Sequence, residues 1–454
     1  MATWEKFAAL FGDFYNIFVA LTAHSMFTVS CLSFAWSSSV LPKLLESQDS
    51  PLQKPITANE SDLIGAIFYI GAAIGPLCFI SVVNKLGRKK VLAIISLIPP
   101  IAYGILIFAK SVTLYIVCRT FLGIYVGAAF SIQPVYLAEV LAMEERAFLM
   151  SFVTLFSFIG VFTAFTVGHF IPVVHFNGLI AVLSTIVLIL VTFGFPDSPY
   201  YVIQHENNRK MMVLLKKLRT RRVNVNEEFE EIQNRAACET EDSWLQIFCT
   251  KDNIKALISA TIPLLLQSSC GVIFLMNYNQ LIFMQTSITI SSHYCSIIVV
   301  SLTFSTTFLA PILLKRKKIT PGTLLMCCLL GVGVCNIIMS LYFFYGRHIS
   351  YLSWLPLMVL VCSVLIYNCG LDPIPWMILG NSYPVSISAV GTAVSISIFE
   401  LSVFPTMFLF HKVNMSYLFL FSSICCALGI VYVKFVVGPS EELIFEKITR
   451  NFKF

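Results

Sequence analysis

Charged residues are scarce in this chain. Aspartate, glutamate, lysine and arginine make up 12% of its 454 residues, and hydrophobic residues make up 57%. Soluble proteins carry roughly 25% charged residues. A chain this long and this poor in charge is therefore not a set of soluble domains. Its composition indicates an integral membrane protein whose surroundings include the lipid bilayer.

The sequence also lacks the patterns that mark a metal site or an enzyme. Fourteen cysteines are present, but most lie inside apolar runs and none are paired at metal-ligand spacing in a polar loop. We interpret them as small hydrophobic residues. No nucleophile and base stand together in a loop. We expect neither enzymatic activity nor a cofactor.

Long apolar runs, in contrast, are abundant. A membrane-spanning helix needs about 17 to 25 apolar residues, and about twelve such runs occur. Six of them run from Tyr15 to Val40, Leu63 to Val83, Val91 to Phe108, Val112 to Leu137, Phe148 to Ile171 and Phe176 to Phe195. The other six run from Ile254 to Phe283, Ser292 to Leu314, Thr320 to Phe344, Leu352 to Leu379, Ile387 to Phe410 and Tyr417 to Val437. No cleavable signal peptide precedes them, so the first span is expected to direct targeting.

One polar segment separates the two sets of spans. We expect an N-terminal six-helix bundle at 1–195, a cytoplasmic linker with short helices at 196–253, a C-terminal six-helix bundle at 254–437 and a short cytoplasmic tail at 438–454. Within the linker, NEEFEEIQNRA from Asn226 predicts one amphipathic helix. The alternative is a solvated connection without fixed structure.

The basic residues gather in short loops on one side of the predicted membrane. Although the net charge of +6 could suggest a nucleic-acid partner, the positive-inside rule gives these residues another role, which is to orient the protein. They follow span two (Lys85, Arg88, Lys89 and Lys90), follow span eight (Lys315 to Lys318) and recur in the linker. Both termini are then cytoplasmic, the loop from Leu41 to Asp62 is external, and no nucleic-acid partner is expected.

Two sites match the pattern for N-glycosylation on the external side, Asn59-Glu60-Ser61 and Asn414-Met415-Ser416. Both lie close to predicted span ends, so we do not expect either to be used.

The most informative stretch runs from Arg119 to Ala147 and is expected to form a long apolar helix that breaks at Pro134. An arginine inside an apolar span is costly and usually faces a protein interior or an aqueous path. Two roles for Arg119 stay open: a tie between two helices, or a group that faces an aqueous path. Gly123 and Gly127 are four residues apart, so they share a helix face and allow a neighbouring helix to approach closely.

Several motifs lie near predicted span ends. They are Ser33-Phe34-Ala35-Trp36 followed by serines and Val40-Leu41-Pro42; Gly87-Arg88-Lys89; Arg119 with Gly123; Pro134, Tyr136, Glu139 and Arg146; and Pro196-Asp197-Ser198-Pro199. Together they resemble the motifs of sugar porters of the major facilitator superfamily, most closely those of insect facilitated trehalose transporters. The resemblance extends from Ala23 to Val437 and implies that superfamily's fold, with two six-helix bundles around a central site.

The resemblance implies gating and structural roles for eight residues. Gly87 permits a tight turn, and Arg88 and Lys89 can reach carbonyls or carboxylates at helix ends. Glu139 and Arg146 are expected to form part of an ion-pair latch that breaks and re-forms. Pro373 and Pro375 interrupt a span and are expected to act as a hinge. Arg119 is the eighth of these gating and structural residues.

It also implies a sugar site, but this chain departs from the family pattern there. Gln267 matches the family pattern. Four other positions differ from it: Ser268 replaces a glutamine, Ile273 an asparagine, Thr154 a glutamine, and Glu400-Leu401 the pair Asn-Trp. Asp372 replaces a glycine and could cap the next half-helix. A glutamate in an apolar helix is a functional candidate, although one neutralised by protonation is an alternative. The candidate substrate-binding residues are Gln267, Ser268, Tyr278, Trp376, Thr154 and Glu400.

The expected function is passive uptake of a hexose or trehalose across the plasma membrane by alternating access, through a cavity lined by spans one, four, five, seven, eight, ten and eleven. Ala35 stands where proton-coupled members carry an aspartate, which favours facilitation. The alternatives are transport of another solute, with proton coupling through Glu400, or a non-transporting sugar sensor. The sensor is favoured by Asn381 and Ser388, which replace the acid and the base of the second-half latch, and disfavoured by the short tail from Gly438. The oligomeric state stays open, with a monomer as the expectation.

Overall fold

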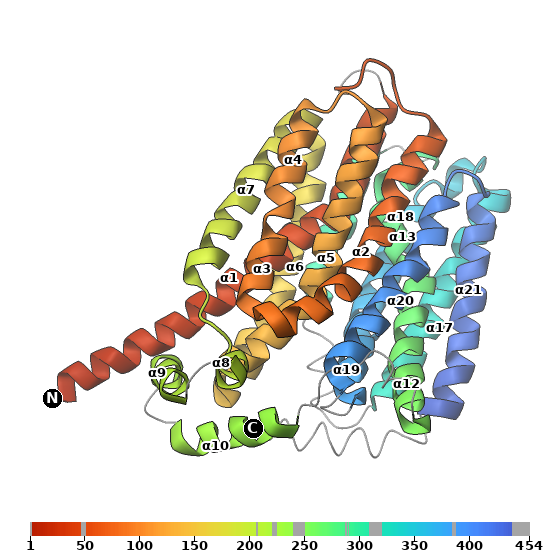
Figure 1. The fold of residues 1–454 in the computed structure, drawn as a ribbon. Helices are drawn as coiled ribbons and strands as arrows, with labels where there is room; N and C mark the ends of the chain where they lie inside the picture. The colour runs from red at the N-terminus through yellow and green to blue at the C-terminus, as the bar shows by residue number, and fades with distance from the viewer. Residues whose placement is uncertain are drawn as a thin grey trace.

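The computed structural model describes residues 2–46, 51–205, 208–219, 225–238, 250–286, 288, 290–307, 320–383 and 387–437. The expected tail at 438–454 and the basic run from Lys315 to Lys318 lie outside the described residues. Within the described ranges the regular structure is helical and contains no strand, which confirms the all-α prediction (Figure 1).

Ten helices in the described ranges are long and apolar enough to cross a membrane. The first six predicted spans correspond to α1 (Ala2–Leu45), α2 (Ala58–Leu86), α3 and α4 (Arg88–Ser96 and Ile98–Phe108), α5 (Val112–Val140), α6 (Met143–Phe170) and α7 (Val173–Gly194). The last six correspond to α12, α13 and α14 (Lys251–Ser269, Val272–Asn277 and Asn279–Met284), α15 (Ser292–Thr307), α17 (Pro321–Leu341), α18 and α19 (Leu355–Ile366 and Pro373–Ser382), α20 (Ser388–Phe408) and α21 (Met415–Tyr432).

The helices of each half pack mainly on one another. In the N-terminal half α1 packs on α6 and α7, and α2 packs on α5; in the C-terminal half α17 packs on α21, and α12 packs on α20. Contacts between the halves run along α2 with α20 and along α6 with α15. Figure 1 shows the two halves side by side.

The predicted glycine face lies between α2 and α5. A Cβ atom on Gly123 would stand 2.0 Å from the carbonyl oxygen of Phe68, and one on Gly127 would stand 2.0 Å from that of Ala72. The two backbones touch at this face, so the small-residue prediction is confirmed. The predicted break at Pro134 is wrong, because α5 continues through this proline to Val140.

Span seven differs from the single helix that was expected. It ends as α12 at Ser269, and Gly271 then takes a φ of 91°, in the left-handed region that favours glycine. Non-helical backbone at membrane depth persists only where protein or a cavity surrounds it. Here the Asn336 side-chain amide donates to the freed carbonyl of Cys270 at 2.8 Å.

The linker forms short helices α8 (Pro199–His205), α9 (Asn208–Leu218) and α10 (Val225–Cys238) at one end of the N-terminal half (Figure 1). The predicted amphipathic helix is α10. Arg219 donates from Nε to both carboxylate oxygens of Glu228, at 2.9 and 2.7 Å, and from Nη1 to the Val140 carbonyl at 2.6 Å. Arg219 therefore ties the described part of the linker around α9 and α10 to α5.

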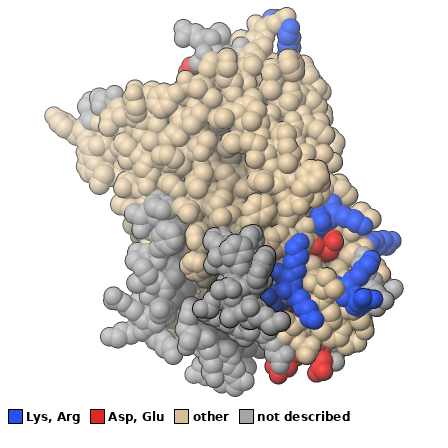
Figure 2. Space-filling view, turned by 90° about the vertical axis from the view of Figure 1, so that its left-hand side faces the viewer, with Lys and Arg blue, Asp and Glu red and all other residues tan. Residues whose placement is uncertain are grey.

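Charges of the described residues are segregated along the molecule. Figure 2 shows lysine and arginine side chains gathered at the linker end of one face, whereas the middle of that face shows neither basic nor acidic residues. An uncharged belt with most of the basic residues of this face at one border fits a bilayer-spanning protein, and the orientation given by the positive-inside rule stays a prediction.

Candidate functional site

The turn after α2 has the geometry that its glycine motif predicts. Gly87 has a φ of 85°, and a Cβ atom there would stand 3.1 Å from ring carbons of Tyr201. Arg88 then begins α3 and donates from Nε to Glu139 Oε1 at 3.1 Å, while Lys89 is partly exposed in the same turn.

Glu139 joins three segments at this end of the protein. Besides Arg88, its carboxylate accepts a hydrogen bond from the hydroxyl of Ser198, immediately before α8. Arg146, in the first turn of α6, donates from Nη2 to the Leu141 carbonyl at 3.2 Å. The residues expected in the latch thus lie at one end of the N-terminal half, and their gating role stays a prediction.

Arg119 is completely buried and ties α5 to α1. Its Nη1 donates to the Ser33 carbonyl at 2.7 Å and its Nη2 to Ser37 Oγ at 2.9 Å. Its guanidinium carbon lies 4.3 Å from the ring centroid of Phe68 and 4.9 Å from that of Trp36, within range of cation–π attraction. No carboxylate among the described residues pairs with it. These contacts favour the first of its two predicted roles, a tie between helices.

Trp36, the aromatic residue of the first motif, is fully buried. Its indole Nε1 donates to Asn177 Oδ1 of α7 at 2.9 Å. A buried indole needs such an acceptor. Trp36 therefore connects α1 to α7 in the core of the N-terminal half.

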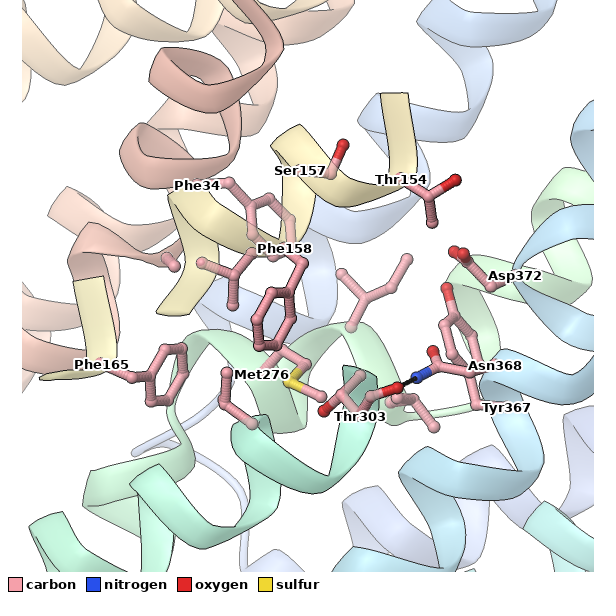
Figure 3. A pocket seen from close by; sticks show the side chains of 15 residues that line it. Phe34, Thr154, Ser157, Phe158, Phe165, Met276, Thr303, Tyr367, Asn368 and Asp372 are labelled. Atoms are coloured by element: carbon pink, nitrogen blue, oxygen red, sulfur yellow. Dashed lines mark hydrogen bonds between the residues drawn. The ribbon is translucent and has the colours of Figure 1, made fainter. Parts of the chain in front are cut away.

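A cavity of about 200 Å³ lies between the two halves (Figure 3). Fifteen residues line it, from α1, α6, α13, α15, the π-helical segment η3 (Tyr367–Leu371) and the residue that follows it. They are Phe34, Ala35, Thr154, Ser157, Phe158, Val161, Phe165, Val272, Ile273, Met276, Val300, Thr303, Tyr367, Asn368 and Asp372. Spans one, five, seven, eight and ten thus line the cavity as predicted, whereas spans four and eleven supply no residue to it.

The cavity has a polar end and an apolar end. In Figure 3 its polar side chains Thr154, Thr303, Tyr367, Asn368 and Asp372 lie on one side. Phe34, Phe158, Phe165 and Met276 lie on the other. Side chains from the N-terminal and C-terminal halves contribute to both ends, so relative movement of the halves would alter the whole lining.

The break in span ten positions Asp372 at the polar end. The backbone N–H of Asp372 donates to the Tyr367 carbonyl at 3.0 Å, five residues back, and Pro373 begins α19 directly afterwards. Pro375 lies in the same first turn. Prolines lack the backbone donor, and the local departure from α-helix matches the predicted interruption. The suggestion that the Asp372 side chain caps α19 is wrong, because it makes no such hydrogen bond.

Gln267 of α12 lies one layer behind the polar end. Its Nε2 donates to the Tyr367 hydroxyl at 2.9 Å and to Asp372 Oδ1 at 3.3 Å, while its Oε1 is buried without a hydrogen-bond partner in the described structure. Gln267 thus positions two lining side chains, and its Oε1 stays available to accept a hydrogen bond. Of the six candidate substrate-binding residues, Thr154 alone lines this cavity.

Two candidates instead join helices of the C-terminal half. Ser268 Oγ lies 2.6 Å from Ser402 Oγ of α20. The Tyr278 hydroxyl donates to the Met407 carbonyl at 3.2 Å, and its ring stacks on Phe410 with centroids 4.0 Å apart. Their binding roles stay predictions that would require a different conformation.

The last two candidates, Trp376 and Glu400, lie away from this cavity. Trp376 meets Phe130 of α5 and Phe399 of α20 edge-on, with ring centroids 6.3 and 5.8 Å apart. Glu400 of α20 is 4% exposed, and its carboxylate has no hydrogen bond or ion pair among the described residues. A buried carboxylate without a partner is costly, so Glu400 stays a functional candidate.

Four polar lining residues were not predicted from the sequence: Ser157, Thr303, Tyr367 and Asn368. Asn368 carries the clearest signal, because an amide in an apolar span is costly unless it faces a polar partner. Ser157 lies three residues after Thr154, on the same helix face. The other two resemble ordinary hydroxyl residues of membrane helices and gave no separate signal.

Comparisons with known proteins agree with this architecture. The family model described as sugar (and other) transporter matches residues 13–452. The chain belongs to the sugar (and other) transporter family. It is 26% identical to a facilitated trehalose transporter Tret1 of Polypedilum vanderplanki, over 96% of this chain and 88% of the relative. It is also 26% identical to Tret1 of Culex quinquefasciatus, over 96% and 86%.

Solved structures of the major facilitator superfamily share the fold of this sugar transporter family member. The proton:xylose symporter XylE bound to 6-bromo-6-deoxy-D-glucose matches with a TM-score of 0.74 at 17% identity, over 94% of this chain and 96% of that one. A partially occluded, inward-open XylE from E. coli matches with a TM-score of 0.75 at 16% identity, over 93% and 98%. The chain is thus a multi-pass sugar transporter of this superfamily fold, and it is not an enzyme.

Proposed function

We propose that the protein carries a hexose or trehalose passively across the plasma membrane, with both termini cytoplasmic, by alternating access. The observation that carries the proposal is the central cavity, whose lining comes from both halves of the molecule. Its polar end offers the hydroxyl, amide and carboxylate groups that a polyol needs, and its aromatic end can cover an apolar sugar face.

The size of the cavity favours a single sugar ring in this conformation. A cavity of about 150 Å³ holds benzene, and the cavity here measures about 200 Å³. One six-membered sugar ring with its substituents nearly fills a cavity of this volume. Trehalose, with two rings, would require the halves to separate further.

Contacts across the end expected to be external support an alternating cycle. There Asp62 of α2 pairs with His411 after α20, the N–H of Gln280 donates to Ser38 Oγ at 3.5 Å, and His169 faces His293 with ring centroids 6.4 Å apart. Each contact joins the two halves. All three would have to break when the cavity opens to that side.

The surroundings of Arg119 support passive transport. This cation contacts a carbonyl, a hydroxyl and two aromatic rings, and its Nε is buried without a hydrogen-bond partner among the described residues. By the family resemblance, Ala35 stands where proton-coupled members carry an aspartate. Among the residues that the structure describes, no carboxylate pairs with Arg119. The relatives described as facilitated trehalose transporters point in the same direction.

A second candidate function is proton-coupled transport, and the unpaired carboxylate of Glu400 favours it. A buried carboxylate that lacks a hydrogen-bonding partner can exchange a proton during a cycle. In that case the imposed proton gradient, rather than the sugar gradient alone, would drive uptake.

Counterflow in liposomes containing the purified protein tests the first proposal. Vesicles loaded with unlabelled glucose should accumulate radiolabelled glucose transiently, and Thr154→Ala should slow this exchange about three- to tenfold, the effect of one hydrogen bond. The matched control is Thr163→Ala on the same helix, where the hydroxyl bonds to the Ile159 carbonyl outside the cavity. Equal rates for the two variants would contradict a sugar site in this cavity.

A further inference from the structure

The cavity contains one carboxylate among its fifteen lining residues, that of Asp372. Its described hydrogen-bonding neighbours are neutral: the amide of Gln267 donates to it at 3.3 Å, and the hydroxyl of Tyr367 lies beside it. No arginine, lysine or histidine among the described residues forms an ion pair with it. The site therefore holds an anionic group whose counter-charge the surrounding side chains do not supply.

Aromatic and thioether groups face this carboxylate across the cavity. Phe34, Phe158 and Phe165 lie at the opposite end with Met276, and the Tyr367 ring lies beside Asp372 (Figure 3). Aromatic rings attract cations through their negatively charged faces. Apolar side chains such as these also cover a hydrocarbon body well.

A neutral sugar uses this lining incompletely. Its hydroxyl groups can donate to Asp372, but they bring no positive charge, and a desolvated anion without a counter-ion remains unfavourable. The aromatic end also offers few hydrogen-bonding groups to the remaining hydroxyls of a polyol, and each buried hydroxyl that stays unpaired costs about 1 to 3 kcal/mol.

We propose that the cavity also binds a protonated organic amine with a single-ring apolar body, whose ammonium group pairs with Asp372 while its ring lies among the phenylalanines. Such a molecule supplies the missing charge and fills the apolar end. The cavity volume of about 200 Å³ suits one ring with a short side chain. The inference rests on the cavity proposed for transport and adds a second class of ligand to it.

The test compares two ligands of similar shape that differ in charge. Binding of 2-phenylethylamine, protonated at neutral pH, and of the neutral 2-phenylethanol is measured by titration calorimetry on the purified full-length chain in detergent. The amine should bind at least tenfold more tightly than the alcohol. Asp372→Asn should weaken amine binding at least tenfold and alcohol binding far less, because the amide oxygen of Asn can still accept a hydrogen bond from a hydroxyl. Asp252→Asn, which makes the same change at an exposed position in the first turn of α12, is the control.

Equal affinity of the wild-type protein for amine and alcohol would overturn the proposal, as would amine binding that survives Asp372→Asn. The first comparison needs no variant, so it decides the question even if Asp372→Asn fails to fold. Amine binding is measured without sugar or flux. A lack of amine binding can therefore be told apart from a lack of glucose counterflow, which tests the proposed transport function.

Discussion

The imidazole Nδ1 of His411 lies 2.5 Å from Oδ1 of Asp62, and the backbone N–H of His411 donates to Oδ2 of the same carboxylate at 3.1 Å. Asp62 belongs to the second turn of α2 and is fully buried, whereas His411 follows α20. Two hydrogen bonds to one buried carboxylate thus join the two halves at the end expected to be external.

Asp62→Ala removes both of these bonds and should favour opening at that end. We expect backbone amides around the start of α2 and the end of α20 to exchange hydrogen for deuterium several-fold faster, because local opening exposes them. The control is Thr406→Ala in α20, which removes a hydroxyl that bonds within its own helix, to the Val403 carbonyl. Hydrogen exchange is measured by mass spectrometry. An exchange rate in Asp62→Ala equal to that of the wild type would show that the Asp62–His411 pair does not help to close the cavity.

Arg119→Leu should destabilise the N-terminal half. The substitution deletes hydrogen bonds from a charged group to Ser33 and Ser37, each worth about 1.5 to 3 kcal/mol, and leaves the Ser33 carbonyl buried without this donor. Thermal unfolding of the purified protein should begin at a clearly lower temperature than for the wild type. If Arg119→Leu unfolds at the wild-type temperature, the assignment of Arg119 as a tie between helices is wrong.

Gly123→Ala should disturb the contact between α2 and α5, since the added Cβ would stand 2.0 Å from a backbone oxygen of Phe68. Backbone cannot move aside as a flexible side chain can, so the helices must separate. Gly104→Ala in α4 is the matched control, with no atom within 4 Å of its added Cβ. We expect a large loss of folded protein after extraction for the first variant and little change for the second. Similar recovery of both would contradict close packing at this face.

Glu400→Gln should raise the thermal unfolding temperature. The carboxylate is 4% exposed and unpaired within the described part of the chain, so at a pH where it is ionised a neutral amide removes the cost of burying that charge. A gain of about 1 kcal/mol or more is expected. A lower unfolding temperature would show that the carboxylate makes a stabilising interaction that Gln cannot replace.

The sequence predicted the fold well because its strongest signals are local. Apolar length locates membrane helices, and the Gly123 and Gly127 spacing identifies a face without any knowledge of its partner. The break at Gly271 was missed because an isolated glycine in an apolar run has the same appearance whether or not the helix continues through it.

The cavity could be predicted only in part, because which face of each helix meets it depends on packing against several neighbours. Thr154 was found through a motif position, yet Tyr367 and Asn368 face the cavity through a π-helical turn that no hydrophobic pattern reveals. Gln267 was predicted to bind substrate, which stays a prediction; in this conformation its side chain hydrogen-bonds to Tyr367 and Asp372.

Net glucose uptake by liposomes containing the purified protein tests the central claim most directly, measured with and without an imposed inward proton gradient. A facilitative carrier predicts saturable uptake that stops when the internal and external glucose concentrations are equal and that ignores the proton gradient. Accumulation above the external concentration when the gradient is imposed, or no saturable uptake by folded protein, would contradict the account.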